Sequence, residues 1–291
     1  MDFSMRRKLT LLATSRAQIV RGKCNIQPIA PVDPIFIAEQ RGCEVRFMSL
    51  PSLEGVYSTN PKSVIILGSQ RPSGRRTFTC AHELGHHEFK HGTRLEELNP
   101  EITHDYKDPD EFLADMFAAS LLMSQVSVRN ALKDRQLQPI DTEPLNVFVL
   151  ASYFGVGYGT LVDHMTWTLR LLTTKQRKHL LKTQPRALKA IFGGTPQTEV
   201  ILVDKFWQDR AVDLEIGDTL VLPNGATVDN ASKLKSKGKV DGQETFAATS
   251  KGYTRAYNLL SGWAINIRIA SKQYEGLAKY RFLVDPEEDS I

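Results

Sequence analysis

Two histidines and a glutamate stand at a spacing that can bind a metal ion and activate a water molecule. Within residues 79–90, His82 and His86 are four positions apart, so in a helix both imidazoles project from one face and can bind a single cation. Glu83 is one position further round, where its carboxylate can reach a water held by the cation rather than the cation itself. This H-E-x-x-H spacing supplies two neutral nitrogen ligands and a general base, which is typical of hydrolytic zinc sites.

A third ligand must come from outside this helix, because a catalytic zinc ion has three protein ligands and one open position. We predict that Glu111, at the start of a strongly helical stretch over residues 111–123, is that ligand. Asp115, one turn later on the same face, is placed to accept a hydrogen bond from a ligand imidazole and fix its tautomer. The alternative is that both carboxylates are simply favoured by the helix dipole near the N-terminus of their helix.

Other ionisable residues around the motif compete less well as ligands. His87 projects about 100° away from His86 on a helix and cannot share its ligand face. We expect Glu88 and His91 to lie on the surface or behind the ligands, whereas His104, in an acidic segment, could approach the site. A hydrolytic site also needs a donor for the oxyanion. The sequence offers four candidates and does not rank them: Tyr57, Arg75, His87 and His104.

Several elements must position these side chains. We predict one helix within residues 1–30, which ends in a link punctuated by prolines, and a second helix over residues 35–40. We predict strands over residues 43–48, 53–58 and 63–67. The polar turn at residues 59–62 makes the last two strands a hairpin, and the basic loop 70–76 leads into the His82 helix. The hairpin could present an exposed edge strand that pairs with an extended substrate. Alternatively, the small sheet is only a scaffold.

The two motifs together resemble a known family. Residues 76–87, with His82, Glu83 and His86, followed by Glu111-x-x-Ala114-Asp115 and the residues up to Met123, are similar to the IrrE/ImmA-like zinc metallopeptidases over roughly residues 15–130. The resemblance implies zinc held by His82, His86 and Glu111, with Glu83 as the general base. It also implies a protein substrate, because members typically cleave an XRE-like helix-turn-helix repressor and so release genes for stress response, mobile elements or phage. Ser124 replaces the usual proline after this stretch, outside the site.

Residues 145–172 resemble a helix-turn-helix, with two short helices around a turn at Gly155-Val156. A DNA-reading second helix would carry Arg, Lys, Asn or Gln in its first turns. Residues 158–165 instead offer Tyr158, Thr160, Asp163 and His164, so we favour a structural helical module over direct DNA binding. The stretch 170–189 has seven Lys or Arg and no acidic residue, which leaves a backbone-contacting surface possible, although a solvated basic helix face is the commoner explanation.

Beyond a linker at residues 193–196 the apolar pattern changes to a period of two. We predict strands over residues 200–203, 219–222, 244–248, 263–270 and 280–284, and a polar loop over 233–243. The fold class is therefore α+β, with a zincin-like metallopeptidase domain over residues 1–138, a helix-turn-helix-like module over 139–193 and a β-rich C-terminal domain over 194–291. The last domain shows no catalytic motif, and a sensing or docking role follows only from its position.

Composition restricts the class of protein only broadly. The chain has 291 residues, 41% of them hydrophobic, and a formal net charge of +4, which neither requires nor excludes a nucleic-acid partner. Its three cysteines form no C-x-x-C pair, and no uninterrupted apolar segment approaches the roughly 20 residues that span a bilayer. We therefore expect a cytoplasmic protein without a membrane partner.

Two other classes of function stay open. The chain could bind a repressor or DNA and act by occupancy, with a zinc ion that is only structural. It could also be a metal-dependent hydrolase of a small molecule, although nothing in the sequence indicates a deep apolar pocket.

Overall fold

The computed structural model describes residues 1–97, 108–207 and 210–284, and the chain divides into two compact units. Unit 1 comprises Met1–Ala131 and Glu275–Ala278, and unit 2 comprises Leu132–Tyr274 and Lys279–Ile291. The fold is mixed α+β, as predicted. The helical segment and the later strands lie together in unit 2, and the boundaries after residues 138 and 193 stay predictions.

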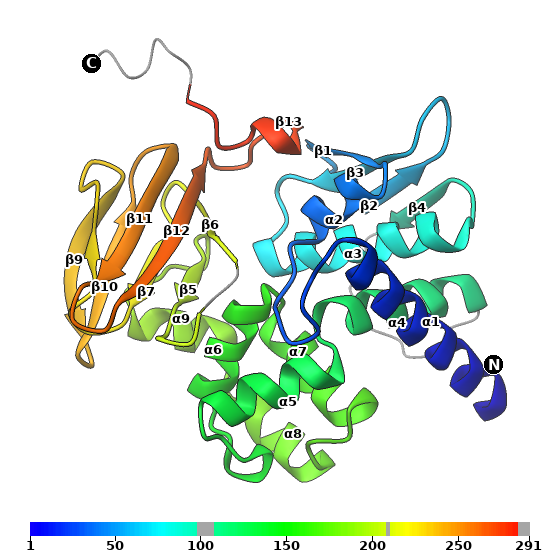
Figure 1. Ribbon diagram of the computed structural model, residues 1–291, viewed down its shortest axis with the longest axis horizontal. Helices are drawn as coiled ribbons and strands as arrows, with labels where there is room; N and C mark the ends of the chain where they lie inside the picture. Colours follow the sequence, from blue (N-terminus) through cyan, green and yellow to red (C-terminus); the bar gives the residue numbers. More distant parts are fainter. Residues whose placement is uncertain (98–107, 208–209, 285–291) are drawn as a thin grey trace. The chain divides into compact units, whose positions relative to one another are not determined.

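Unit 1 contains one five-stranded sheet, in the order β13-β1-β3-β2-β4 (Figure 1). Its strands are β1 (Glu44–Met48), β2 (Leu53–Ser58), β3 (Val64–Gly68), β4 (Arg94–Glu97) and β13 (Gly276–Leu277). β2 and β3 form the predicted antiparallel hairpin, in which Tyr57 pairs with Ile65. The suggestion that this hairpin has an exposed edge is wrong, because β4 pairs with the other side of β2 and β13 pairs with β1. β4 is the outermost strand next to β2.

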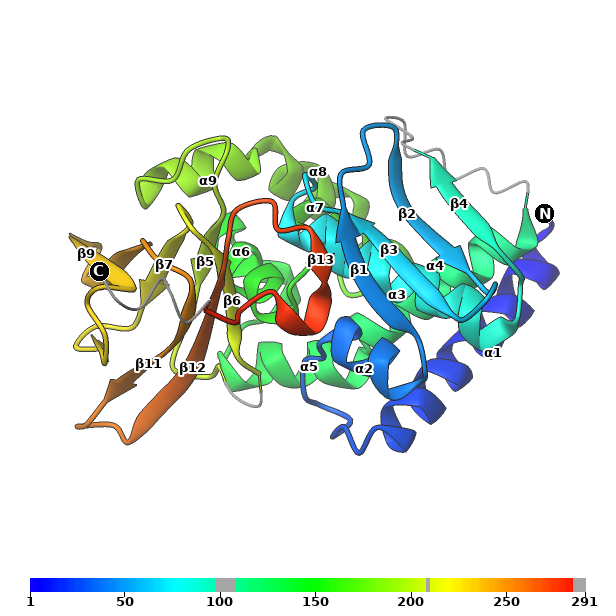
Figure 2. The same cartoon turned by 90° about the horizontal axis from the view of Figure 1, so that it is seen from above.

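The helices of unit 1 lie against this sheet and against one another. They are α1 (Phe3–Lys23), α2 (Pro34–Gln40), α3 (Ser73–Phe89) and α4 (Pro109–Leu122). The next helix, α5 (Gln125–Asp134), begins in unit 1 and ends in unit 2. α3 packs on β2 and β3, and α4 packs against both α3 and α1 (Figure 2). The chain thus places α3, which carries the histidines, between the sheet and α4, which carries Glu111.

Gly85 allows α3 and α4 to approach closely. A Cβ atom at this position would lie 3.0 Å from the Cα of Ala114 and 3.2 Å from the ring of Phe117. Any larger residue would therefore push the two helix backbones apart. Because Gly85 is adjacent to His86 and Ala114 follows Glu111 by one turn, this contact sets the spacing of the candidate ligands.

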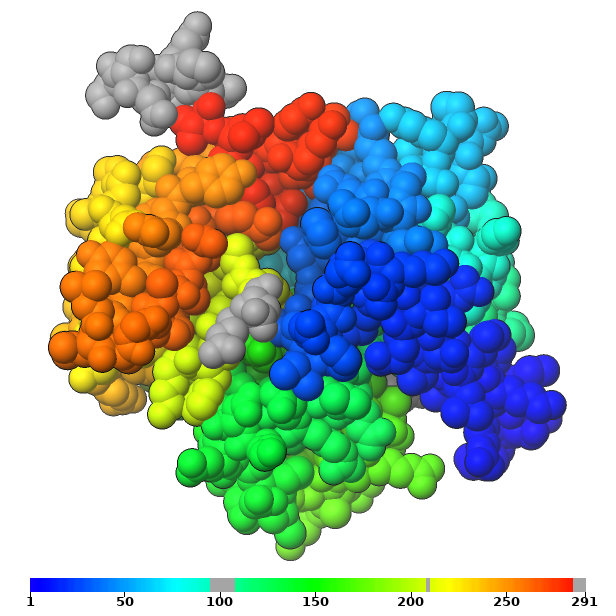
Figure 3. All heavy atoms as spheres, viewed as in Figure 1, coloured from blue at the N-terminus to red at the C-terminus, as the bar shows by residue number. Residues whose placement is uncertain are grey.

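Arg21 of α1 holds the C-terminal end of α4 by a hydrogen bond. Arg21 is only 1% exposed, and its guanidinium donates hydrogen bonds to the carbonyl oxygens of Leu121 (2.8 Å) and Gln27 (2.9 Å). Burial lowers the pKa of this guanidinium to about 10, so it stays charged at neutral pH. Arg21 thus connects α1 both to the Leu121 carbonyl in the last turn of α4 and to the segment that follows α1. The start of α1 is exposed to solvent, with Phe3 77% exposed (Figure 3).

Unit 2 begins with short helices. They are η1 (Pro139–Asp141), α6 (Pro144–Phe154), α7 (Tyr158–Asp163), η2 (His164–Thr168), α8 (Thr174–Lys182) and α9 (Pro185–Ile191). α6 and α7 confirm the predicted helix pair, bent by 102° at a turn where Gly155 has a φ of +66°. The second helix faces the interior, because Tyr158 is 4% exposed and donates a hydrogen bond to the carbonyl of Leu180 (2.9 Å).

The later part of unit 2 forms two four-stranded sheets, β5-β7-β10-β9 and β6-β12-β11-β8. The strands are β5 (Val200–Leu202), β6 (Val212–Glu215), β7 (Thr219–Leu222), β8 (Thr227–Val228), β9 (Leu234–Val240), β10 (Gln243–Ala248), β11 (Gly252–Asn258) and β12 (Trp263–Ala270). In β12, Ile265, Ile267 and Ile269 are buried, as the alternating pattern predicts.

Two predictions for this region are wrong. Residues 233–243 do not form a loop, because β9 pairs along β10 as an edge strand whose exposed lysines discourage further pairing. Residues 280–284 do not form a strand, because the 3₁₀ helix η3 (Ala278–Tyr280) occupies the start of that segment. The strand near the end of the chain is β13, which belongs to the sheet of unit 1.

One apolar helical stretch, Pro109–Asp134, is long enough to cross a membrane by length and composition. However, 72% of its most apolar window is buried inside the fold, which is typical of a core helix. The bent pair Pro144–Phe154 and Tyr158–Thr168 passes the same test only if both helices are counted as a single span.

Candidate metal centre

The fold brings His82 and His86 of α3 together with Glu111 of α4. One ligand atom from each lies within 4.8 Å of the others. The Nε2 atoms of the two histidines are 3.0 Å apart, and Oε2 of Glu111 lies 3.2 Å from Nε2 of His82 and 3.5 Å from that of His86. The histidine side chains are 4% and 1% exposed and that of Glu111 is 38% exposed, so the cluster is open to solvent on the Glu111 side.

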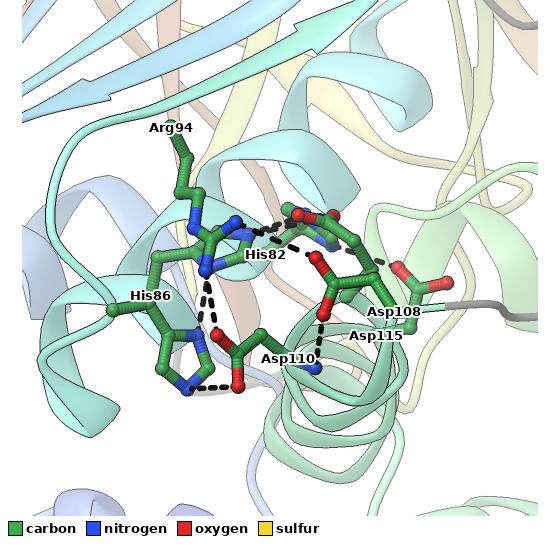
Figure 4. Close-up of polar contacts among 8 residues, drawn as sticks. His82, His86, Arg94, Asp108, Asp110 and Asp115 are labelled. Carbon is green, nitrogen blue, oxygen red and sulfur yellow. Dashed lines mark hydrogen bonds and ion pairs between the residues drawn. The ribbon is translucent and has the colours of Figure 1, made fainter. Parts of the chain in front are cut away.

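A hydrogen bond to Asp115 on the far side of His82 turns the Nε2 lone pair of this histidine toward the cluster. Its Nδ1 lies 2.7 Å from Oδ1 of Asp115 (Figure 4). A carboxylate only accepts hydrogen bonds, so Nδ1 of His82 carries the proton and Nε2 of the neutral ring has a lone pair. Asp115 therefore lies where the sequence prediction placed it, at hydrogen-bonding distance from a candidate ligand.

The distances among the three candidate ligand atoms fit a tetrahedral metal site. Bonds of about 2.0–2.1 Å to zinc imply ligand-to-ligand edges of roughly 3.3–3.4 Å in a tetrahedron. The edges here are 3.0, 3.2 and 3.5 Å. With their lone pairs turned to the same space, two imidazole nitrogens and a carboxylate oxygen would all be attracted to a divalent cation placed between them. The donor set therefore fits a metal ion.

Glu111 reaches the cluster from the first turn of α4. Asp108 caps this helix by accepting a hydrogen bond from the amide of Asp110 (2.8 Å), and Pro109 occupies its first position. Contacts with His82 and then with His86 hold the pKa of the Glu111 carboxyl far below its usual range, so it is ionised at neutral pH. The helix dipole also favours a carboxylate in the first turn. Glu111 can therefore be both a metal ligand and a carboxylate that stabilises the start of its helix.

Glu83 lies on α3 beside β2 and is fully buried, with 0% exposure. A Cβ atom at Gly55 of β2 would lie 2.9 Å from Oε1 of Glu83 and 2.4 Å from Cγ2 of Thr79. Gly55 therefore leaves the space that the Glu83 carboxylate occupies. Sequence reasoning did not identify this glycine, because its only signal is the close approach of a helix to the strand.

Of the four candidate donors for the oxyanion, the three that the structure describes contact residues other than the candidate ligands. Tyr57 and His87 contact each other, with the hydroxyl 2.9 Å from Nδ1, and Nε2 of His87 lies 3.2 Å from the carbonyl oxygen of Arg41. This pair links β2 and α3 to the end of α2. Arg75 pairs with the buried Glu54 (3.1 Å). His104 lies outside the described residues.

Glu88 and His91 lie behind the candidate ligands. Glu88 is 7% exposed and pairs with Arg41 (2.6 Å) and Arg16 (3.5 Å), which excludes it from the ligand cluster. His91 contacts the ring of His86 through Nδ1 at 2.9 Å, on the side away from Glu111. Burial lowers the pKa of His91, which favours a neutral imidazole at neutral pH.

Comparison with known protein families matches residues 38–165 to the IrrE N-terminal-like domain, Peptidase_M78. The match covers α3 and α4 with all three candidate ligands, and it continues through α6 and α7. It does not include α1 or the strands from β5 onward. No curated protein matches the chain.

Proposed function

Residues 38–165 belong to the IrrE N-terminal-like family (Peptidase_M78), and from this premise we propose that the chain is a zinc-dependent endopeptidase acting on a transcriptional repressor. The observation that carries the proposal is the convergence of His82, His86 and Glu111, with ligand atoms 3.0–3.5 Å apart. The family supports a metallopeptidase. The identity of the metal, the protein substrate and a zincin-like arrangement of α3 and α4 are parts of the proposal.

Zinc is the metal that this donor set suits best. Two imidazoles and one carboxylate form a known catalytic zinc set, whereas calcium and magnesium prefer oxygen ligands alone. A bound zinc ion supplies a Lewis acid that polarises a peptide carbonyl and lowers the pKa of a water molecule. His82 and His86 would hold it through Nε2, and Glu111 would add one negative charge.

Glu83 is the general base in this proposal. Its carboxylate accepts the proton of the attacking water and then passes it to the departing amine nitrogen. Asp115 keeps the proton of His82 on Nδ1, 2.7 Å away, so that Nε2 faces the metal. The edge of β4 could pair with the main chain of an extended peptide, because β4 is the outermost described strand on that side of the sheet.

The proposed substrate is an XRE-like helix-turn-helix repressor, whose cleavage would release stress-response, mobile-element or phage genes. Support comes from the family of residues 38–165 and from the paired motifs at His82 and Glu111. Cleavage in the reducing cytoplasm fits three free cysteines, two of them buried. We assign the sheets of unit 2 a sensing or docking role from their position in the chain alone.

Incubation with a candidate repressor tests this function. We expect the zinc-loaded protein to cut a helix-turn-helix repressor encoded by a neighbouring gene at one discrete position, as intact mass spectrometry would show. A chelator should abolish the cut, and added zinc should restore it. Stable binding of the repressor without any cut would instead favour a regulator that acts by occupancy. Turnover of small esters or amides without any protein cleavage would favour a small-molecule hydrolase.

A further inference from the structure

A second set of polar side chains lies behind His86, and neither the motif nor the family match assigns it a role. We propose that His91, held by Asp110, is a positioning residue that orients the His86 imidazole for metal binding. The inference rests on the part of the proposed function that places a metal ion at His82, His86 and Glu111, and it does not depend on peptide cleavage. Figure 4 shows Arg94, Asp110 and Asp108 gathered beside the histidines.

The contacts run in sequence from Arg94 to the candidate ligand. Nη2 of Arg94 lies 2.6 Å from Oδ2 of Asp110, and Oδ1 of Asp110 lies 3.5 Å from Nε2 of His91. Nδ1 of His91 lies 2.9 Å from Nδ1 of His86. The other nitrogen of His86, Nε2, lies 3.5 Å from Oε2 of Glu111. One nitrogen of His86 therefore faces the metal cluster and the other faces His91.

Only one distribution of protons suits both a metal ion and Asp110. A neutral imidazole has one N–H donor and one lone pair. If Nε2–H of His91 points at the Asp110 carboxylate, Nδ1 of His91 is an acceptor and can receive the Nδ1–H of His86. His86 then presents its Nε2 lone pair to the cation. His91 thus does for His86 what Asp115 does for His82, with an imidazole as the acceptor in place of a carboxylate.

The end of α3 places His91 in this position. Lys90 adopts the left-handed conformation, with φ +60°, and the amide of His91 bonds to the carbonyl of His86 (3.1 Å). The amide of Lys90 bonds to the carbonyl of His87 (3.2 Å), which completes a Schellman motif. The ring of His91 stacks on Phe89, with centroids 5.7 Å apart and planes 18° apart. The motif folds the chain back so that His91 meets the His86 ring edge-on, with the ring planes 67° apart.

Asp110 connects the contact between His91 and His86 to Glu111, the third candidate ligand. It immediately precedes Glu111 in the first turn of α4, where its amide is capped by Asp108. A contact between His91 and Asp110 therefore joins the end of α3 to the turn that carries Glu111. We infer that it also helps to fix the separation of His86 and Glu111.

Zinc affinity of the full chain, measured by competition with a chelator and without any substrate, tests the inference. His91→Phe keeps an aromatic ring that can stack on Phe89 but removes both nitrogens. It should lower zinc affinity by about 10–100-fold, the usual cost of losing a hydrogen-bond partner of a metal ligand. Asp110→Ala, which leaves His91 in place, should give a smaller loss in the same direction. The visible spectrum of the cobalt-substituted protein should change in both variants.

His87→Phe is the matched control, because His87 lies on α3 next to His86 and its contacts with Tyr57 and the Arg41 carbonyl involve no candidate ligand. It should lower thermal stability and leave zinc affinity and the cobalt spectrum unchanged. A folded His91→Phe variant with wild-type zinc affinity would overturn the inference. Should that variant fail to fold, wild-type affinity in Asp110→Ala would overturn it instead.

The same measurements separate this inference from the proposed function. If zinc affinity depends on His91 but no protein is ever cleaved, the inference stands and the endopeptidase proposal fails. If the wild-type protein cleaves its repressor and His91→Phe binds zinc normally, the endopeptidase proposal stands and the inference fails.

Discussion

Replacing Glu83 by glutamine should abolish cleavage while leaving zinc bound. Glutamine has nearly the same shape as glutamate, and the pocket beside Gly55 is filled closely enough to hold it in place. Its amide cannot accept a proton from water, so the general-base contribution is lost. We expect the rate constant for cleavage, kcat, to fall by about 10²–10⁴-fold, the usual range for removing a general base. Single-turnover cleavage assays and zinc content per protein measure the two effects separately.

Glu88→Gln is the matched control for this substitution. Glu88 is a second buried glutamate on α3, but it pairs with Arg41 at 2.6 Å and not with the candidate ligands. Loss of this partly buried ion pair should lower the free energy of unfolding by about 1–3 kcal/mol, because the Arg41 side chain is 26% exposed and can be hydrated. It should leave kcat of the folded protein near wild type. Undiminished cleavage by Glu83→Gln would contradict the assignment of the base. Persistent derepression by this variant in cells, without cleavage, would favour regulation by binding.

Replacing Glu111 by glutamine should remove the anionic ligand and most of the affinity for zinc. The Glu111 carboxyl lies 3.2 Å and 3.5 Å from the two imidazole nitrogens, and these contacts lower its pKa and so favour the ionised form. We expect zinc affinity to fall by more than the roughly 10–100-fold that removal of an outer hydrogen-bond partner causes. Asp115→Asn alters the hydrogen-bond partner of His82 and leaves all three candidate ligands in place, so it should show that smaller loss of zinc affinity.

Thermal unfolding with and without zinc measures this effect independently. A ligand that binds only the folded state stabilises it by RT ln(1 + [L]/Kd), which is about 2.7 kcal/mol at a zinc concentration of 100 Kd. The wild-type Tm should therefore rise when zinc is added, and the Tm of Glu111→Gln should rise much less at the same concentration. Equal shifts for both proteins would show that Glu111 is not a ligand.

The sequence predicted those elements whose signal is local. The i, i+4 spacing of His82 and His86 needs only a helix to put both rings on one face, and α3 provides it. The hairpin of β2 and β3 and the alternation of Ile265, Ile267 and Ile269 in β12 are likewise encoded in neighbouring residues. Such patterns survive in the structure because burial of one face depends directly on them.

The wrong predictions concern contacts between distant segments. β9 looks like a loop in sequence because it is polar and contains Gly238, yet pairing with β10 makes it a strand. β13 has only two residues and exists because it pairs with β1, more than 200 residues earlier in the chain. The position of β4 beside β2, which removes the expected edge, depends on the same kind of long-range pairing.

For the site, the candidate ligands and Asp115 could be predicted from the sequence, but the other residues that contact and position them could not. Glu111 and Asp115 follow from the need for a third ligand and from helical spacing, and the structure brings both to the histidines. The contact between His91 and His86 depends on a left-handed conformation at Lys90, a position where glycine is the usual signal. The role of Gly55 depends on how closely β2 approaches α3, which sequence spacing does not encode.

Anomalous diffraction at the zinc absorption edge, from crystals of the wild-type protein grown with zinc, tests the central claim most directly. The account predicts one strong peak bonded to Nε2 of His82, Nε2 of His86 and the carboxylate of Glu111, with no protein group at a fourth position. A peak elsewhere, or a protein side chain in that fourth position with Glu111 turned away, would contradict it.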